Sequence, residues 1–196
     1  MAILNVSPLG MPSDTRIPAN QIVPVVPILA PSTAAIAAGN GIAPEATSAI
    51  SNQNFDDAIV KLIEVEKLVK RHNYQELKVS SKLNLAELNY YLQNYKKAKS
   101  EMEIALSFID KNERNSDLAY AYILNGLILT RLNEFAAAED YLQKADKICI
   151  ALNDESSQAN VILGFGILEM QRKNFNKAVN YFNAAIPIFR VEDLKY

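Results

Sequence analysis

The side chains with catalytic potential are few and lie far apart in this chain. The single histidine, His72, follows Lys70 and Arg71 at the end of a segment with helical periodicity, where a solvated or dipole-stabilised imidazole is the expected state. The single cysteine, Cys149, lies in the apolar stretch KICIAL with no histidine near it in sequence, which favours a buried, inert thiol over a nucleophile. The sequence therefore predicts no metal site, whether of clustered histidines or of several cysteines.

The remaining polar patterns also have simple structural interpretations. The sequence GFG at 164–166 lies inside a helical segment, where glycines serve close packing rather than the cradling of a phosphate. The acidic groups in EVEK, SEME and AAAED are most simply outer helix faces that pair with lysines. Because no group of interacting titratable residues is found, we expect no enzymatic activity and no cofactor.

Length, charge and hydropathy narrow the class of protein. A chain of 196 residues can form one domain with a hydrophobic core, and a net charge of −2 argues against a nucleic-acid partner. The apolar stretch 22–39 contains three prolines and follows only one basic residue, Arg16, so we expect neither a membrane-inserted helix nor a secretory signal. The single cysteine suits a reducing compartment, which makes the cytoplasm the expected location.

The chain divides near residue 44 into two regions of different composition. Residues 1–44 hold seven of the eight prolines and only two charged residues, Asp14 and Arg16, which predicts an extended, poorly ordered segment. In residues 45–196, apolar residues recur at intervals of three and four without a proline until Pro187, which predicts an all-α domain. We expect helices over 45–52, 55–72, 74–92, 95–111, 116–132, 135–152, 155–172 and 175–190.

One residue pattern returns every 40 residues in this second region. An aromatic residue followed three positions later by alanine occurs at Phe55 and Ala58, Tyr95 and Ala98, Phe135 and Ala138, and Phe175 and Ala178. Two further columns of mostly small residues are Ala46, Ala86, Gly126 and Gly166, twelve positions before each alanine, and Val65, Ala105, Ala145 and Ala185, seven positions after it. Small side chains let two helices approach closely, and we expect the aromatic rings to fill the adjoining space.

These columns resemble the tetratricopeptide repeat (TPR) family, whose signature couples a small residue in the first helix with an aromatic-x-x-small element in the second. The resemblance covers about residues 45–190 and implies an α-solenoid of antiparallel helix pairs, with three full repeats and a partial N-terminal one. The spacing of 40 exceeds the common length of about 34 residues, and Lys82, Tyr122 and Ile162 replace the family's frequent tryptophan. Another α-solenoid with repeats of about forty residues is the alternative architecture.

The resemblance also implies a binding groove on the concave surface, which the first helices of the pairs line. The residues that match its inner columns are Leu83, Glu87, Tyr90, Tyr91, Tyr120, Ile123, Leu127, Thr130, Arg131, Asn160, Leu163, Ile167, Met170 and Gln171. They lack the cationic clamp with which one subgroup holds chaperone C-termini, and they suit an apolar extended segment or an amphipathic helix. The leucines and isoleucines could equally pack helix against helix, so Tyr90, Tyr91 and Arg131 are the stronger candidates.

The expected function is therefore that of a noncatalytic protein-protein interaction module, an adaptor or chaperone that binds a protein or peptide partner. Two alternatives are a bacterial secretion-system chaperone or assembly component, and a regulator that senses a short peptide. The apolar sequence IVPVVPILAP at 22–31 suggests in addition that the N-terminal segment docks into the groove of its own molecule or of a neighbour; a flexible leader or a secretion signal is the alternative. The fold alone does not identify the partner.

Overall fold

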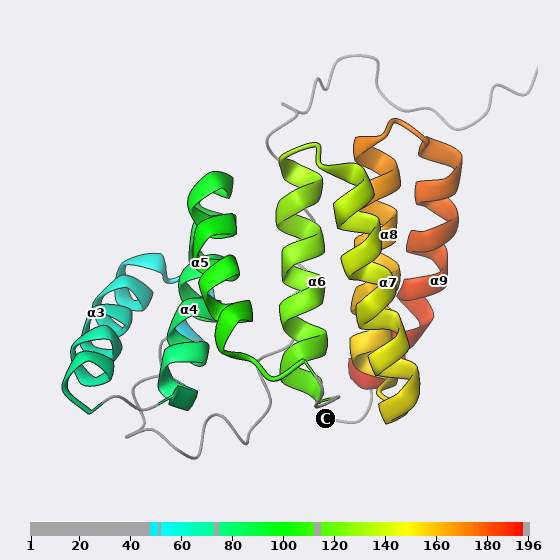
Figure 1. Cartoon of the computed structure of the whole chain (residues 1–196). Helices are drawn as coiled ribbons and strands as arrows, with labels where there is room; N and C mark the ends of the chain where they lie inside the picture. Colours follow the sequence, from blue (N-terminus) through cyan, green and yellow to red (C-terminus); the bar gives the residue numbers. More distant parts are fainter. Residues whose placement is uncertain (1–47, 51, 73–74, 112–114, 194–196) are drawn as a thin grey trace, which may run out of the picture.

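The computed structural model describes residues 48–50, 52–72, 75–111 and 115–193 (Figure 1). Within these ranges the regular structure is entirely α-helical, which confirms the predicted fold class. The predicted extended segment 1–44 lies outside the described residues, as does most of the predicted helix 45–52, of which residues 48–50 are helical. The helices are α3 (Phe55–His72), α4 (Gln75–Tyr91), α5 (Tyr95–Phe108), α6 (Ser116–Arg131), α7 (Phe135–Leu152), α8 (Glu155–Gln171) and α9 (Phe175–Asp193).

Two helix ends differ from the prediction by about three residues. Helix α5 ends at Phe108 instead of 111, because Ile109 adopts an extended conformation that directs the chain toward α6. Helix α9 continues to Asp193 with Pro187 inside it. Both Pro187 and Asn183, whose carbonyl loses its helical partner to the proline, are exposed, so water can solvate that carbonyl and the helix does not have to stop.

The tight turns that precede α3, α5, α7 and α9 share one backbone geometry. A residue with positive φ occurs in each turn, at Gln53, Gln93, Asn133 and Lys173, again 40 residues apart. In the turn after α4, Gln93 N–H donates to the Tyr90 carbonyl at 3.0 Å and Asn94 N–H donates to the Asn89 carbonyl at 2.8 Å. This pair of bonds is a Schellman motif, which satisfies the last carbonyls of one helix before the next helix begins.

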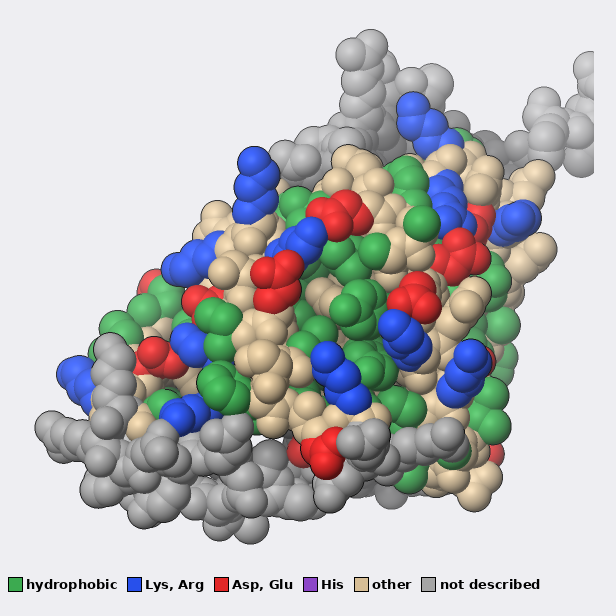
Figure 2. Space-filling view, in the orientation of Figure 1, with side chains coloured by type: hydrophobic (Ala, Val, Ile, Leu, Met, Phe, Trp, Pro, Cys, Tyr) green, Lys and Arg blue, Asp and Glu red, His purple; other side chains and the backbone are tan. Residues whose placement is uncertain are grey.

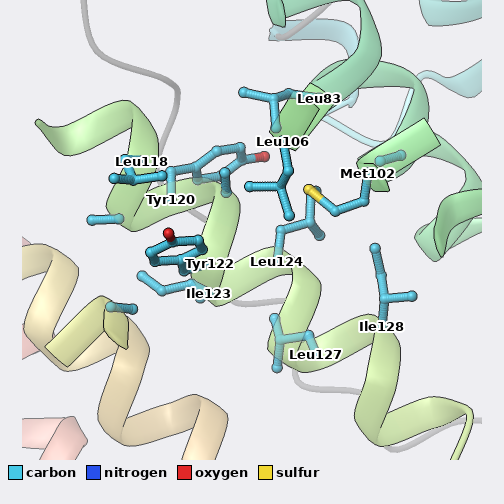
Figure 3. Packing of buried hydrophobic residues seen from close by; sticks show 14 of the residues in the cluster. Leu83, Met102, Leu106, Leu118, Tyr120, Tyr122, Ile123, Leu124, Leu127 and Ile128 are labelled. Carbon is cyan, nitrogen blue, oxygen red and sulfur yellow. The ribbon is translucent and has the colours of Figure 1, made fainter. Parts of the chain in front are cut away.

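The helices stand side by side in a row that runs from α3 to α9 (Figure 1). The most extensive contacts join α4 to α5, α6 to α7, and α8 to α9, and α6 also packs against α8. Because α6 has neighbours on several sides, every residue from Leu118 to Thr130 is buried. Figure 3 shows the core beside it, where leucine and isoleucine side chains of α6 meet Leu83 of α4 and Met102 of α5. None of the helices described here is long and apolar enough to span a membrane.

The close helix crossings use the small residues of the repeat, but the side chains that fill them are not the predicted ones. A Cβ atom at Gly126 would lie 2.8 Å from Cγ of Leu142, and one at Gly166 would lie 2.4 Å from Cε1 of Phe182. Leu142 and Phe182 therefore occupy the space left by the two glycines. The aromatic column was expected to fill the adjoining space, and it does so only in part. Phe55, Tyr95 and Phe135 are half-buried against clusters that contain Ala58, Ala98 and Ala138, whereas Phe175 is exposed.

The aromatic column points instead toward the following helix pair. Phe55 at the start of α3 stacks on Tyr91 at the end of α4, with ring centroids 6.0 Å apart. Phe135 at the start of α7 lies 5.7 Å from the guanidinium carbon of Arg172, just after α8. Phe55 and Phe135, each at the first position of its helix, thus contact the end of the next helix along the chain.

Candidate functional site: the inner face of α4, α6 and α8

The fourteen predicted groove residues all lie on α4, α6 and α8, and we call the side of these helices that carries them the inner face. None of the fourteen is exposed. The half-buried members are Tyr91, Arg131, Leu163, Met170 and Gln171, and the fully buried ones are Leu83, Glu87, Tyr90, Tyr120, Ile123, Leu127, Thr130, Asn160 and Ile167. The inner face is therefore a closely packed surface rather than a set of free side chains.

The aliphatic members of the set belong to the hydrophobic core. Leu83, Ile123, Leu127 and Ile167 are part of one buried cluster that also contains residues of α5 and α7, and Leu163 packs against its edge. These side chains stabilise the contacts between helices by removing apolar surface from water. Their burial agrees with the interpretation that they pack helix against helix.

Aromatic rings gather at the C-terminal end of α4. The centroids of Tyr90 and Tyr91 are 5.7 Å apart, and those of Tyr90 and Tyr95 are 5.8 Å apart. Burial raises the pKa of Tyr95, and the positive charge of nearby Arg131 acts in the opposite direction. The guanidinium at the end of α6 is thus placed beside the tyrosine cluster, and its Nε atom is buried without a hydrogen-bond partner.

Glu87 is a carboxylic acid buried among apolar residues of α4 and α6. Burial raises the pKa of Glu87 to about 7, and the hydroxyl of Tyr120 offsets part of that rise. The approach of these two groups falls short of a well-formed hydrogen bond, because the buried Tyr120 hydroxyl has no partner of acceptable geometry. Figure 3 shows this hydroxyl directed from α6 toward Leu83, which lies one turn before Glu87 on α4. The pair is a weakly satisfied polar contact in the α4–α6 interface.

Asn160 on α8 occupies the same repeat column as Tyr120, 40 residues further along the chain. Its Nδ2 atom donates to the Ser156 carbonyl at 3.1 Å, whereas its buried Oδ1 atom has no hydrogen-bond partner. One column of the repeat therefore carries an unsatisfied polar atom on α6 and another on α8. The sequence predicted both residues as members of the groove, but their missing hydrogen bonds are visible only in the structure.

The opposite side of the row has a feature that the sequence did not predict. A surface hollow of about 390 Å³ lies between α5 and α7, with Asn125 and Leu129 of α6 among its lining residues. The Nζ atom of Lys99 bonds the Glu134 carboxylate at 2.7 Å across it. Figure 2 shows hydrophobic side chains in the middle of this face, surrounded by lysines and acidic residues. The two partners are 35 residues apart, so the 40-residue columns gave no signal for this contact.

Cys149 and the acidic side chains are the remaining described groups with potential chemistry. Cys149 is buried, as predicted, and burial together with the charges of Asp154 and Asp146 raises the pKa of its thiol to about 12. In the part of the chain that the structure describes, no three histidine, cysteine, aspartate or glutamate residues are arranged to hold a metal ion. The side chain of His72 lies outside the described residues. The inner face carries polar atoms of Tyr120 and Arg131 close to the tyrosine cluster at the end of α4.

A scan against models of protein families gave no match, and a search of curated proteins also gave none.

Proposed function

We propose that the chain is a TPR-like α-solenoid that acts as a noncatalytic protein-binding module, with the inner face as the site that holds a segment of a partner protein. The helix pairs, the 40-residue columns and the repeated turn geometry support the architecture. In such arrays each unit contacts mainly its neighbours, and the first helices line an extended surface. That surface corresponds to the inner face of α4, α6 and α8.

The observation that carries the proposal is the set of buried polar atoms without partners on this face. They are the Arg131 Nε and the Asn160 Oδ1, beside which the Tyr120 hydroxyl is only weakly satisfied by Glu87. A buried polar group without a hydrogen bond costs about 1–3 kcal/mol, so a folded protein seldom keeps several of them in one region. A ligand that supplies the missing donors and acceptors would remove this cost.

The same atoms favour an extended segment over an amphipathic helix as the ligand. The main-chain N–H and C=O groups of an extended peptide are free to bond to a partner, whereas those of a helix already bond to one another. The rings of Tyr90, Tyr91 and Tyr95 contact one another, Arg131 lies near Tyr95, and the rings provide apolar contact area. We therefore infer that the ligand is an extended, largely apolar peptide with main-chain groups exposed for hydrogen bonding.

A peptide selection with matched variants tests this proposal. Peptides selected from a random library on the whole protein would be measured by calorimetry against a Tyr91→Ala/Arg131→Ala variant. The control is Lys99→Ala/Tyr141→Ala, which removes one cation and one tyrosine from the hollow on the opposite face. We expect the inner-face variant to weaken binding by about tenfold or more, as loss of about 1.4 kcal/mol does, and the control to leave it unchanged. Equal affinities for the two variants, or a loss confined to the control, would show that the ligand binds elsewhere.

A further inference from the structure

Four aromatic rings contact one another in succession at the C-terminal end of α4. The ring centroids of Phe55 and Tyr91 are 6.0 Å apart, those of Tyr91 and Tyr90 are 5.7 Å apart, and those of Tyr90 and Tyr95 are 5.8 Å apart. Tyr90 is buried, whereas the other three rings are half-buried and keep part of their surface accessible. We call these four residues the aromatic band, which extends from the start of α3 to the start of α5.

A hydrogen-bond donor and a surface hollow lie beside the aromatic band. The positive charge of Arg131 is close enough to Tyr95 to act on the pKa of its hydroxyl. The Nε atom of Arg131 is buried and has no hydrogen-bond partner among the described residues. A hollow of about 580 Å³ has Tyr95 and Leu132, the residue after Arg131, among its lining residues. A ligand of the band therefore finds aromatic surface next to a donor that lacks an acceptor.

Neighbouring aromatic rings are the surface on which proteins bind polyproline II segments. Such a segment is extended, has three residues per turn and forms no hydrogen bonds of its own, so its carbonyl groups are free to accept from a donor such as Arg131 Nε. Proline rings pack on the aromatic side chains, and the preformed helix loses little entropy on binding. Proline also has no N–H group, which suits a site whose unused group is a donor. The band therefore fits a segment with two prolines one turn apart.

The chain carries a segment of this kind in its own N-terminal region. Pro24 and Pro27 in the sequence PVVP are three residues apart, which places both rings on one side of a polyproline II helix. None of residues 17–44 is charged, so the segment can cover apolar rings without burying a charge.

The N-terminal region joins the described part of the chain directly beside the aromatic band. Ala49 and Ile50 belong to a buried cluster with Leu88 of α4, and Phe55 and Tyr91 of the band pack against that cluster. Figure 1 shows α3 and α4 together at one end of the row. The 20 residues 28–47 span about 65 Å when extended and about 30 Å as a helix. Because packed helices are about 10 Å apart, this connection reaches the band in either case.

We propose that residues 22–31 bind to the aromatic band of their own molecule as a polyproline II segment. Pro24 and Pro27 pack on the half-buried rings, and a main-chain carbonyl accepts a hydrogen bond from Arg131 Nε. A connection of this length gives the tethered segment an effective concentration of about millimolar, which favours it over the same segment of another molecule. The proposal rests on the inner face being the binding site, and it adds a regulation of that site, because a partner has to displace residues 22–31.

A nitroxide label on the full chain tests where the segment binds. The label would be attached to Asn20→Cys; Cys149 does not compete, because it is buried and its thiol has a pKa of about 12. We expect the amide NMR signals of Gln93 and Asn94, between Tyr91 and Tyr95, to broaden strongly, and that of Lys177 on α9 to stay sharp.

Matched proline substitutions and a mixed sample provide the controls. The Pro24→Ala/Pro27→Ala variant should lose the broadening, whereas Pro8→Ala/Pro12→Ala, which removes two prolines elsewhere in the N-terminal region, should keep it. Unlabelled, isotope-enriched chains mixed with labelled chains should stay sharp. Broadening that appears only in the mixed sample would show that a second copy is the occupant, and broadening that survives Pro24→Ala/Pro27→Ala would show that the prolines do not make the contact. Either result would overturn the proposal.

Calorimetry separates this proposal from the function on which it rests. Peptides selected on the whole protein should bind the Pro24→Ala/Pro27→Ala variant about fivefold more tightly or better than the wild type, because a larger fraction of the molecules has a free band. The Pro8→Ala/Pro12→Ala variant should bind them with wild-type affinity. Equal affinities for all three chains, with sharp signals at Gln93, would overturn the proposal and leave the inner face as the site for a partner. Broadening at Gln93 without peptide binding at the inner face would support the contact and contradict the proposed function.

Discussion

Helices α6 and α9 both carry many apolar residues but have different surroundings in the fold. Helix α6 is buried from Leu118 to Thr130, whereas α9 leaves Phe175, Val179 and Ile186 in contact with solvent. Helix α6 has α7, α5, α8 and α4 around it, while the principal contact of α9 is α8. The difference shows that position in the row, and not the composition of a helix, decides how much of its apolar surface contributes to stability.

The largest expected difference comes from one substitution made in both helices. Ile128 in α6 is fully buried, and Ile128→Ala should reduce the free energy of unfolding by about 2–5 kcal/mol through lost burial and a cavity. Ile186→Ala should reduce it by only about 1 kcal/mol, because Ile186 is 43% exposed and has less apolar surface to lose from the interior. Urea unfolding of the wild type and both variants would be measured at the same protein concentration. Similar losses of unfolding free energy for Ile128→Ala and Ile186→Ala would contradict the conclusion that position in the row decides how much an apolar side chain stabilises the fold.

A buried carboxyl should make the α4–α6 contact sensitive to pH. Glu87 has a pKa of about 7 in the folded chain and about 4.5 when unfolded, so the folded state binds more protons between these values. Stability therefore falls as pH rises from about 4.5 to 7 and stays low above that, by about 3 kcal/mol in total. Glu87→Gln, which cannot ionise, should unfold with little of this dependence and be more stable than the wild type at pH 8. If the free energies of unfolding of the wild type and Glu87→Gln changed in parallel from pH 5 to 8, ionisation of Glu87 would not contribute to the pH dependence.

Overpacking the helix crossings should destabilise the fold more in the central pair, α6 and α7, than in the terminal pair, α8 and α9. Ala138 and Ala178 are equivalent in the repeat and both are buried. Ala138→Leu should cost about 1–3 kcal/mol, because α7 is held between α6 and α8 and cannot move away from the added side chain. Ala178→Leu should cost less, since the open side of α9 lets that helix shift outward. Thermal unfolding would compare the two; a neutral Ala138→Leu would undermine the register assigned to the repeat.

The smallest expected effect concerns the turns inside the helix pairs. Lys173 and Asn133 both have positive φ, at 64° and 62°, a region that glycine adopts freely and asparagine tolerates better than lysine. Lys173→Gly should therefore raise the free energy of unfolding by about 1 kcal/mol, and Asn133→Gly should change it by much less. Denaturant unfolding of both variants measures the difference. If Lys173→Gly lowered the free energy of unfolding instead, the Lys173 side chain would contribute more to stability than its positive φ costs.

Much of the helical pattern was predictable because it depends on local periodicity. Six of the seven helices from α3 to α9 begin at the predicted residue, with Tyr95, Phe135 and Phe175 among them, and the columns of Ala98, Ala138 and Ala178 are buried as expected. Helix ends at α5 and α9 were less predictable, since the conformation of Ile109 and the solvation of the carbonyl before Pro187 depend on their surroundings.

The inner face was predicted as a set of residues but not as a physical site. The repeat columns placed Tyr120, Arg131 and Asn160 on the first helices, because equivalent positions face the same way in every unit. They could not indicate that the polar atoms of these residues lack partners, since hydrogen bonds depend on distances of a few tenths of an ångström between helices. For the same reason, the filling of the Gly166 crossing by Phe182 rather than Phe175 was not foreseen.

The sequence by itself determined the all-α character, the 40-residue spacing and the small residues at which helices cross, because each follows from the period of apolar and small side chains along a helix. Only the tertiary structure decided which apolar stripes are covered. Leu106 and Ile186 are equivalent in the repeat, but Leu106 is 7% and Ile186 43% exposed, because α6 packs on α5 whereas no described helix follows α9 in the row. Burial is a property of neighbours in space, so the same column can stabilise the core at one position and remain in contact with solvent at another.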